Sequence, residues 1–139
     1  MVQEAKSGLY KSCRENIALP CFFHIPLPEY EKVRNQKSTI GSTVEEVCSP
    51  MLNSGLFTSF VEMGDVKGVF VGHDHNDDFA GTLAGICLCY GRKTGYVAAY
   101  KEVLERGARV IVLEEGKESF NTWIRTLAGK ELFYSFDSN

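Results

Sequence analysis

The stretch GVFVGHDHNDDF at residues 68–79 decides how the fold and the function of this chain are interpreted. Its first four residues form a short apolar run that predicts a buried strand. The strand leads directly into GHDH at 72–75. Loops beyond the ends of buried strands commonly carry the binding and catalytic residues of α/β proteins. Because neutral imidazole is a good ligand for zinc, iron, nickel and copper, the two histidines indicate a candidate metal site.

The third histidine of the chain follows another apolar run, LPCFFHI at 19–25. This run predicts a buried strand that ends at His24, followed by a loop that prolines constrain, PLPEY at 26–30. In an extended chain His73 and His75 would point to opposite sides. Gly72 permits a turn that could bring both imidazoles towards a pair of metal ions. Spacing alone leaves open whether the histidines are ligands or core residues.

The rest of the chain predicts a mixed α/β fold with no sign of a second domain. The helix signals include a capping box, in which Thr43 is the N-cap and Glu46 reaches back to it. The expected helices are Val2–Arg14, one that starts at Thr43, one from Asn53 to the stop at Gly64, and one within Tyr96–Arg106. The expected strands form two hairpins, Phe79–Leu83 with Ile86–Tyr90 and Arg109–Glu114 with Phe120–Leu127.

Composition excludes several classes of function. The 139 residues include 18 acidic and 15 basic side chains, so a basic face for nucleic-acid binding has no support. No apolar run approaches the ~20 residues of a membrane span. The five cysteines are odd in number and lack a Cys-x-x-Cys pair, which argues against a zinc ribbon or a disulfide framework. Cys87 and Cys89 are predicted to be small buried residues on one face of a strand.

Two sequence blocks resemble a known family. FFHIPLPEY at 22–30, and GHDH at 72–75 followed by Asp78-Phe79, are similar to the last two signature blocks of calcineurin-like metallophosphoesterases. They look most like the small purple-acid-phosphatase-like branch and its bacterial phosphohydrolase relatives. The resemblance runs from about Leu19 to Leu127 and implies the C-terminal half of an α/β/β/α sandwich, with a mixed sheet and flanking helices. Residues 1–139 would then be a single segment that lacks the N-terminal half of the catalytic domain.

The resemblance also implies roles for the histidines. His24 and His73 would bind one metal ion and His75 the other. In the family, two divalent or mixed-valence ions of iron, manganese or zinc clamp the phosphoryl group of a phosphate ester and generate the hydroxide that hydrolyses it. No catalytic residue is expected in this segment. The candidates to support the ligands from behind are Asp74, Asp77 and Asp78, and Asp78 is the strongest of them.

The chain departs from the family pattern in three ways. The earlier blocks Asp-x-His, Gly-Asp-x-x-Asp and Gly-Asn-His-Asp/Glu are absent, and Gly64-Asp65 only begins like the second of them. Asp77 stands where the branch usually has asparagine, a change expected to alter the surroundings of the ligands. The segment 96–100, YVAAY, replaces a sequence that tends to be rich in glycine, so the loop facing the substrate is expected to differ.

The missing blocks have a physical consequence. Two divalent cations about 4 Å apart repel each other by roughly 17 kcal/mol at an effective dielectric constant of ~20. Bridging anions normally offset that repulsion, and three neutral imidazoles cannot. We therefore expect the isolated chain to bind at most one metal ion weakly and to lack phosphatase activity. Half of a sandwich would also expose sheet edges, so we expect an N-terminal half or a homo-oligomer to cover them.

Two other interpretations remain open at this stage. The chain could be a half-domain that acts without catalysis as a binding or interaction module. It could also be an unrelated α/β protein whose histidines lie in the core or bind a single structural metal, and this interpretation predicts that His24 lies far from His73.

Overall fold

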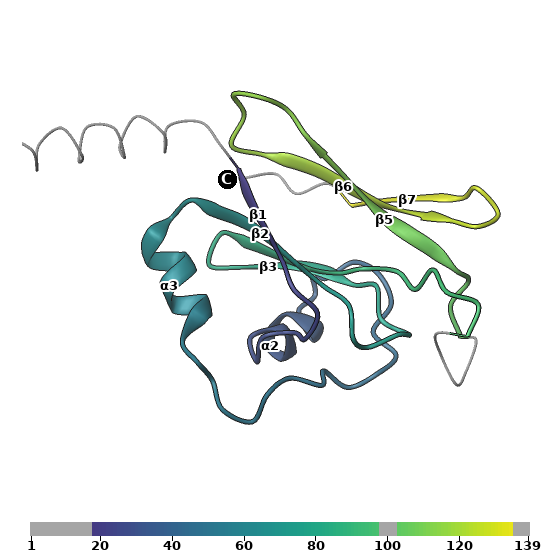
Figure 1. Cartoon of the computed structure of the whole chain (residues 1–139), viewed down its shortest axis with the longest axis horizontal. Helices are drawn as coiled ribbons and strands as arrows, with labels where there is room; N and C mark the ends of the chain where they lie inside the picture. Colours follow the sequence, from purple (N-terminus) through teal and green to yellow (C-terminus); the bar gives the residue numbers. More distant parts are fainter. Residues whose placement is uncertain (1–17, 98–102, 135–139) are drawn as a thin grey trace, which may run out of the picture.

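The computed structural model describes residues 18–97 and 103–134 and shows two sheets with two short helices (Figure 1). The expected helix Val2–Arg14 lies outside the described residues. In the parts described, no helix has the length and apolar character needed to cross a membrane. The elements are β1 (Leu19–Phe22), α2 (Tyr30–Arg34), α3 (Leu56–Met63), β2 (Val66–Val71), β3 (Ala80–Leu83), β4 (Ile86–Tyr90), β5 (Gly107–Leu113), β6 (Phe120–Thr126) and β7 (Glu131–Tyr134).

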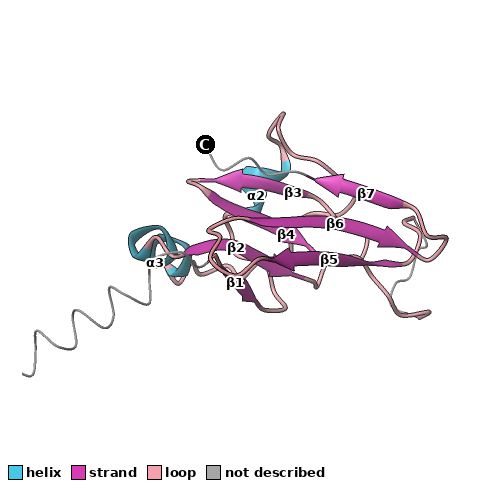
Figure 2. Ribbon diagram, turned by 90° about the horizontal axis from the view of Figure 1, so that it is seen from above, coloured by secondary structure: helices cyan, strands magenta, loops and turns pink. Residues whose placement is uncertain are grey.

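The expected mixed α/β class is confirmed. One sheet has the strand order β1-β2-β4-β3, in which β1, β2 and β4 are parallel and β3 is antiparallel to β4. The other sheet, β5-β6-β7, is antiparallel. Both helices lie on the side of the four-stranded sheet that faces away from β5-β6-β7 (Figure 1), and the three-stranded sheet covers its other face (Figure 2). The described residues thus form half of a layered sandwich, as the family resemblance implied.

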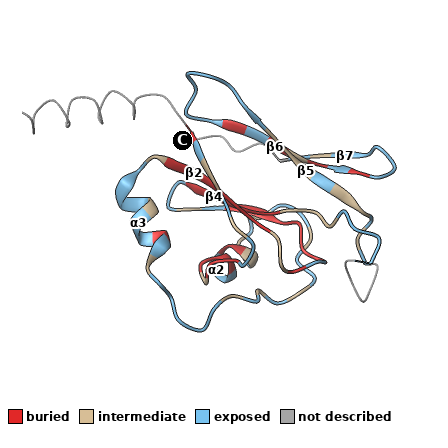
Figure 3. Ribbon diagram, viewed as in Figure 1, coloured by how far each residue is buried: buried red, intermediate tan, exposed pale blue. Residues whose placement is uncertain are grey.

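Two hydrophobic cores lie on the two faces of the four-stranded sheet, and buried residues follow β2 and β4 in Figure 3. Side chains alternate along a strand, so β2 sends Val69 towards the helices and Phe70 towards the second sheet. In β4, Cys87 and Cys89 face the second sheet with their sulfur atoms 3.0 Å apart. The prediction that they are small buried residues is confirmed, and burial raises the pKa of the Cys87 thiol.

The first strand is less buried than predicted. β1 forms as expected, but 41% of Leu19 and 64% of Phe22 are exposed. The reason is position in the sheet, because β1 pairs with β2 alone and lies at the edge of the described sheet. The chain then continues through the proline loop, and a short helix that the sequence analysis did not predict, α2, begins at Tyr30.

The helix predicted to start at Thr43 does not form. Thr43 instead makes an isolated bridge with Asp77, and one carboxylate oxygen of Asp77 accepts hydrogen bonds from the backbone N–H groups of Val44 and Glu45, at 2.6 and 2.9 Å. A carboxylate more than 30 residues away thus takes the amide groups that a capping box would have placed at a helix start. Local sequence could not reveal this competition.

Some of the other predicted elements are confirmed, and others are wrong. α3 ends at Gly64, whose φ is 74°, as predicted. Both hairpins form, and the first turns at Ala84 and Gly85, where φ is 48° and 77°. The helix predicted within Tyr96–Arg106 is not seen at 96–97 or 103–106, and 98–102 lie outside the described residues. β7 was not predicted, and it adds a third strand to the second hairpin.

Candidate metal centre

His24 and His73 meet at one edge of the four-stranded sheet. β1 and β2 are parallel and in register at Phe22 and Phe70, so their carboxyl ends coincide, and the N–H of Gly72 donates to the carbonyl of His24 at 3.1 Å. His24 Nε2 lies 3.3 Å from His73 Nδ1, with the rings edge to face. Because the two rings are in contact, the interpretation that required His24 to lie far from His73 is disfavoured.

The backbone brings the rings together differently from the prediction. The residue in the left-handed region is His73, with φ of 64°, one position after the glycine expected to make the turn. A Cβ atom at Gly72 would lie 3.4 Å from Nδ1 of His24, which is an ordinary van der Waals contact, so the space beside the ring does not by itself require glycine there.

The separation of the two ring nitrogens fits a shared metal ion. Nitrogen ligands lie about 2.0–2.1 Å from zinc, which places two of them roughly 3.3–3.4 Å apart in tetrahedral geometry. The observed 3.3 Å agrees with that separation. Both rings are at least partly open to solvent, so an ion can reach them. The donor set therefore fits the type of ion that the resemblance implies.

The third predicted ligand, His75, is exposed. Among the described residues, the group of three candidate ligands whose donor atoms all lie within 4.8 Å of one another is Cys48, His73 and Asp74. The structure thus joins His73 to a cysteine that the sequence analysis did not single out. No sequence signal pointed to Cys48, since it lies 25 residues before His73 in a polar segment.

Asp74 is buried and held from two sides. Its Oδ2 accepts a hydrogen bond from the Tyr90 hydroxyl at 2.5 Å and from the Cys48 N–H at 3.2 Å. Burial, followed by the hydrogen bond to Asp74, raises the pKa of Tyr90, so the hydroxyl stays protonated and donates. The hydrogen bond to Asp74 and its negative charge also raise the pKa of the Cys48 thiol. Asp74 therefore connects the strand β4 to the loop that carries Cys48.

Asp77 and Asp78 anchor the loop to its surroundings. Asp78 forms a buried ion pair with Arg92 and accepts the N–H of Ser42 at 2.7 Å. Oδ1 of Asp77 accepts the two amides described above, whereas its Oδ2 is buried without a hydrogen-bond partner. Burial raises the pKa of this carboxyl group. These contacts hold the loop in place, and the role of both aspartates in supporting metal ligands stays a prediction.

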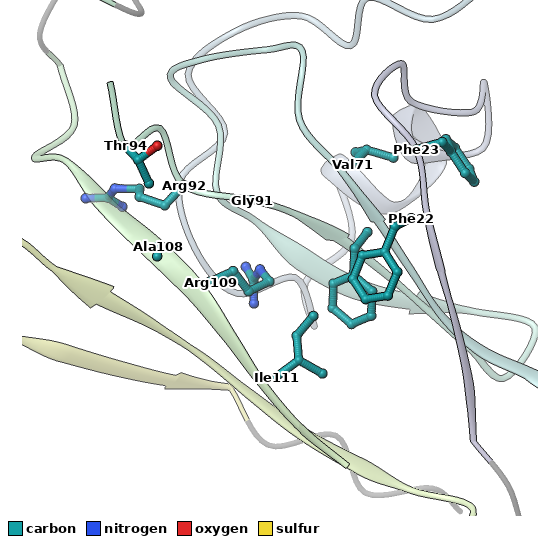
Figure 4. A pocket seen from close by; sticks show the side chains of 10 residues that line it. Phe22, Phe23, Val71, Gly91, Arg92, Thr94, Ala108, Arg109 and Ile111 are labelled. Carbon is teal, nitrogen blue, oxygen red and sulfur yellow. The ribbon is translucent and has the colours of Figure 1, made fainter. Parts of the chain in front are cut away.

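A cavity of about 430 Å³ lies between the two sheets, near the ends of β1 and β2 (Figure 4). Phe22 and Ile111 contribute apolar surface to its lining, and Arg92 and Arg109 contribute charged groups (Figure 4). Arg109 donates to the carbonyl oxygens of Tyr90 and Asp78, at 2.5 and 2.7 Å. The cavity is thus lined by framework residues that join the sheets, and none of the three histidines lines it.

Comparison with known proteins places the chain among phosphatase relatives. It is 46% identical over 102 residues to the "Probable inactive purple acid phosphatase 29" of Arabidopsis thaliana, covering 73% of this chain and 26% of the relative. It is 41% identical to the "Probable inactive purple acid phosphatase 14" of the same plant, with coverage of 73% and 25%. "Phosphatase DCR2" of Saccharomyces cerevisiae is 32% identical over 128 residues, with coverage of 84% and 22%.

The chain spans about a quarter of the length of these curated relatives. No protein-family profile matches it, and no solved structure matches it.

Proposed function

Because this chain belongs by homology to the purple-acid-phosphatase-like branch of the calcineurin-like phosphoesterases, we propose that it is the C-terminal, histidine-bearing part of a two-metal phosphohydrolase that acts on phosphate esters. The observation that carries this proposal is the 3.3 Å contact between His24 Nε2 and His73 Nδ1 at the end of two parallel strands. Residues 49 positions apart are brought to the separation of two ligands on one ion.

Each histidine has a specific part in this proposal. His24 and His73 hold one ion, and His75, exposed in the same loop, is free to meet the second. When bound, a pair of iron, manganese or zinc ions supplies charge stabilisation and a nucleophile for phosphoryl transfer. Asp78, through Arg92 and Ser42, keeps the histidine loop in one position on the sheet. Such support matters, because small misplacements of reacting groups cost large factors in rate.

The isolated chain is proposed to be inactive and to hold at most one ion weakly. Three neutral imidazoles offset none of the roughly 17 kcal/mol of repulsion between two divalent ions at about 4 Å and a dielectric constant of ~20. The anionic bridging ligands would come from the part of the relatives that this chain does not span.

A chimera tests the proposal directly. The matched segment of yeast phosphatase DCR2 is replaced by this chain, and hydrolysis of p-nitrophenyl phosphate is measured after loading with zinc, manganese or iron. We expect metal-dependent turnover that falls at least about 100-fold in the His73→Ala chimera, because a metal ligand is removed. The matched control is Lys67→Ala, at a half-buried side chain of β2, the strand that leads to His73. Turnover that survives His73→Ala, or turnover by the 139-residue chain alone, would contradict the proposal.

A second candidate function is a non-enzymatic half-domain that binds a partner. Two observations favour it: the edge strand β1 carries the exposed Leu19 and Phe22, and two of the relatives carry "inactive" in their names. An N-terminal half or a second copy of the chain would cover that edge. Light scattering and hydrophobic-dye binding test whether a partner covers this edge. A compact monomer that binds no dye would contradict the need for such a partner. An active chimera assigns the chain to the enzyme instead.

A further inference from the structure

We propose that Cys48, His73 and Asp74 form a binding site for a single divalent cation of the zinc type, which uses His73 without the other two histidines. The sulfur of Cys48, a ring nitrogen of His73 and a carboxylate oxygen of Asp74 all lie within 4.8 Å of one another. Sulfur, imidazole nitrogen and carboxylate oxygen are the three donor types that zinc takes in proteins. The site thus assigns a ligand role to Cys48 and Asp74.

Charge favours this group over the histidines as the place where one ion binds. Once a bound cation displaces the thiol proton of Cys48, the thiolate and the carboxylate together bring two negative charges, which balance the divalent cation, and His73 adds a neutral donor. The set of His24, His73 and His75 brings no negative charge. Thiolate ligation also selects softer ions, so zinc is favoured over magnesium or manganese.

To bind zinc, the three donor atoms of this group must move slightly closer together. Zinc lies about 2.0–2.2 Å from nitrogen and oxygen ligands and about 2.3 Å from sulfur, so tetrahedral ligand atoms are roughly 3.3–3.8 Å apart. The group must therefore close by at most about 1.5 Å from its present limit of 4.8 Å. Cys48 is exposed and lies outside helices and strands, so rotation of its side chain can bring the sulfur closer to the other two donor atoms.

Two contacts already orient this group. The backbone N–H of Cys48 donates to Oδ2 of Asp74 at 3.2 Å, so the cysteine is held beside the carboxylate. On the other side, the Tyr90 hydroxyl donates to the same oxygen at 2.5 Å. Hydrogen bonds of this kind fix ligating carboxylates at metal sites, and their loss typically costs 10–100-fold in metal affinity. Asp74 is also buried, unlike the exposed acidic groups that gather at surfaces without binding an ion.

The test is zinc titration of the full 139-residue chain under reducing conditions, with cobalt absorption as a second measurement. A cobalt–thiolate bond gives a charge-transfer absorption that histidine and carboxylate ligands do not give. The variants are Cys48→Ser, His24→Ala and His75→Ala, with Cys21→Ser as the matched thiol control away from the loop. We expect Cys48→Ser to lower zinc affinity at least about 10-fold and to abolish the cobalt–thiolate band. Cys21→Ser should keep both, and circular dichroism checks that every variant is folded.

Several outcomes overturn the inference. One is a wild-type chain that binds zinc without the cobalt–thiolate band, and another is an equal loss in Cys48→Ser and Cys21→Ser. If His24→Ala and His75→Ala lose zinc binding while Cys48→Ser keeps it, the cysteine site is wrong and the histidine arrangement of the proposed function is supported. If the chain binds no zinc at all, the inference fails, whereas the phosphohydrolase proposal is still decided by the chimera.

Discussion

The two sheets of this chain differ in how many of their faces are covered. The candidate ligands lie at one end of the more covered, four-stranded sheet. β2 and β4 lie between the helices on one side and the second sheet on the other, so most of their side chains are buried. In the three-stranded sheet, β6 alternates buried and exposed residues along its length, as expected when one face is open to water. His73 follows β2, one of these covered strands, and His24 follows β1, the more exposed edge strand beside it.

This contrast shows why the covered sheet is suited to hold a metal site. A strand packed on both faces has few ways to shift, and the loops at its end inherit fixed starting positions. The buried ion pair of Asp78 with Arg92 then fixes the loop itself. The three-stranded sheet contributes to packing through Phe120 and Ile111, and its own charged pair, Arg125 with Glu131, is solvent-exposed.

The largest expected effect on the free energy of unfolding comes from removing a buried ion pair, compared with removing an exposed one. The side chains of Asp78 and Arg92 are 1% and 6% exposed, whereas those of Glu131 and Arg125 are 36% and 60% exposed. Asp78→Ala should destabilise the chain by about 3–5 kcal/mol, because it leaves Arg92 buried without its partner. Glu131→Ala should cost less than about 1 kcal/mol. Urea unfolding measures both, and similar losses would show that the two pairs are buried alike.

A smaller effect compares the same substitution in the two sheets. Leu88 in β4 is fully buried, and Leu113 in β5 is exposed. Leu88→Ala should cost about 3 kcal/mol through lost burial and a residual cavity. Leu113→Ala should change the free energy of unfolding by only about 0.5 kcal/mol. Thermal unfolding distinguishes them, and a costly Leu113→Ala would mean that something covers the outer part of β5.

The smallest effect concerns pH and the loop beside the covered sheet. Burial raises the pKa of Asp77 in the folded chain above its ordinary value, so folding favours the protonated form. The stabilisation from this carboxyl group is fully present below the ordinary pKa of 3.8, where it is protonated in both the folded and the unfolded chain. It is lost as the pH rises from there through the raised pKa of the folded chain. Asp77→Asn keeps an oxygen acceptor and removes this loss. The variant should match the wild type at low pH and exceed it slightly at neutral pH, as measured by urea unfolding across pH.

A difference between Asp77→Asn and the wild type that stays constant across pH would contradict this account of the buried carboxyl group. Ser42→Ala is a suitable control, because it changes a neighbouring side chain and leaves the amide that donates to Asp78 in place.

The sequence by itself determined the two histidine blocks and all of the described strands except β7. Alternation and apolar runs predicted β2, both hairpins and the end of α3 at Gly64, because these depend on local periodicity and on residues that tolerate positive φ. The family resemblance rested on linear blocks, and the relatives confirm it. Whether His24, His73 and His75 bind metal stays a prediction.

Only the tertiary structure decided what surrounds those blocks. The contact of His24 with His73 depends on the parallel register of β1 and β2, and the exposure of Phe22 depends on β1 being an edge strand. Asp77 accepts amides of the segment in which Thr43 was expected to cap a helix, and Asp74 holds Cys48 near His73. These contacts join residues from 26 to 49 positions apart, so no local pattern could encode them. Chain folding sets them through side-chain hydrogen bonds and sheet order, which sequence spacing does not reveal.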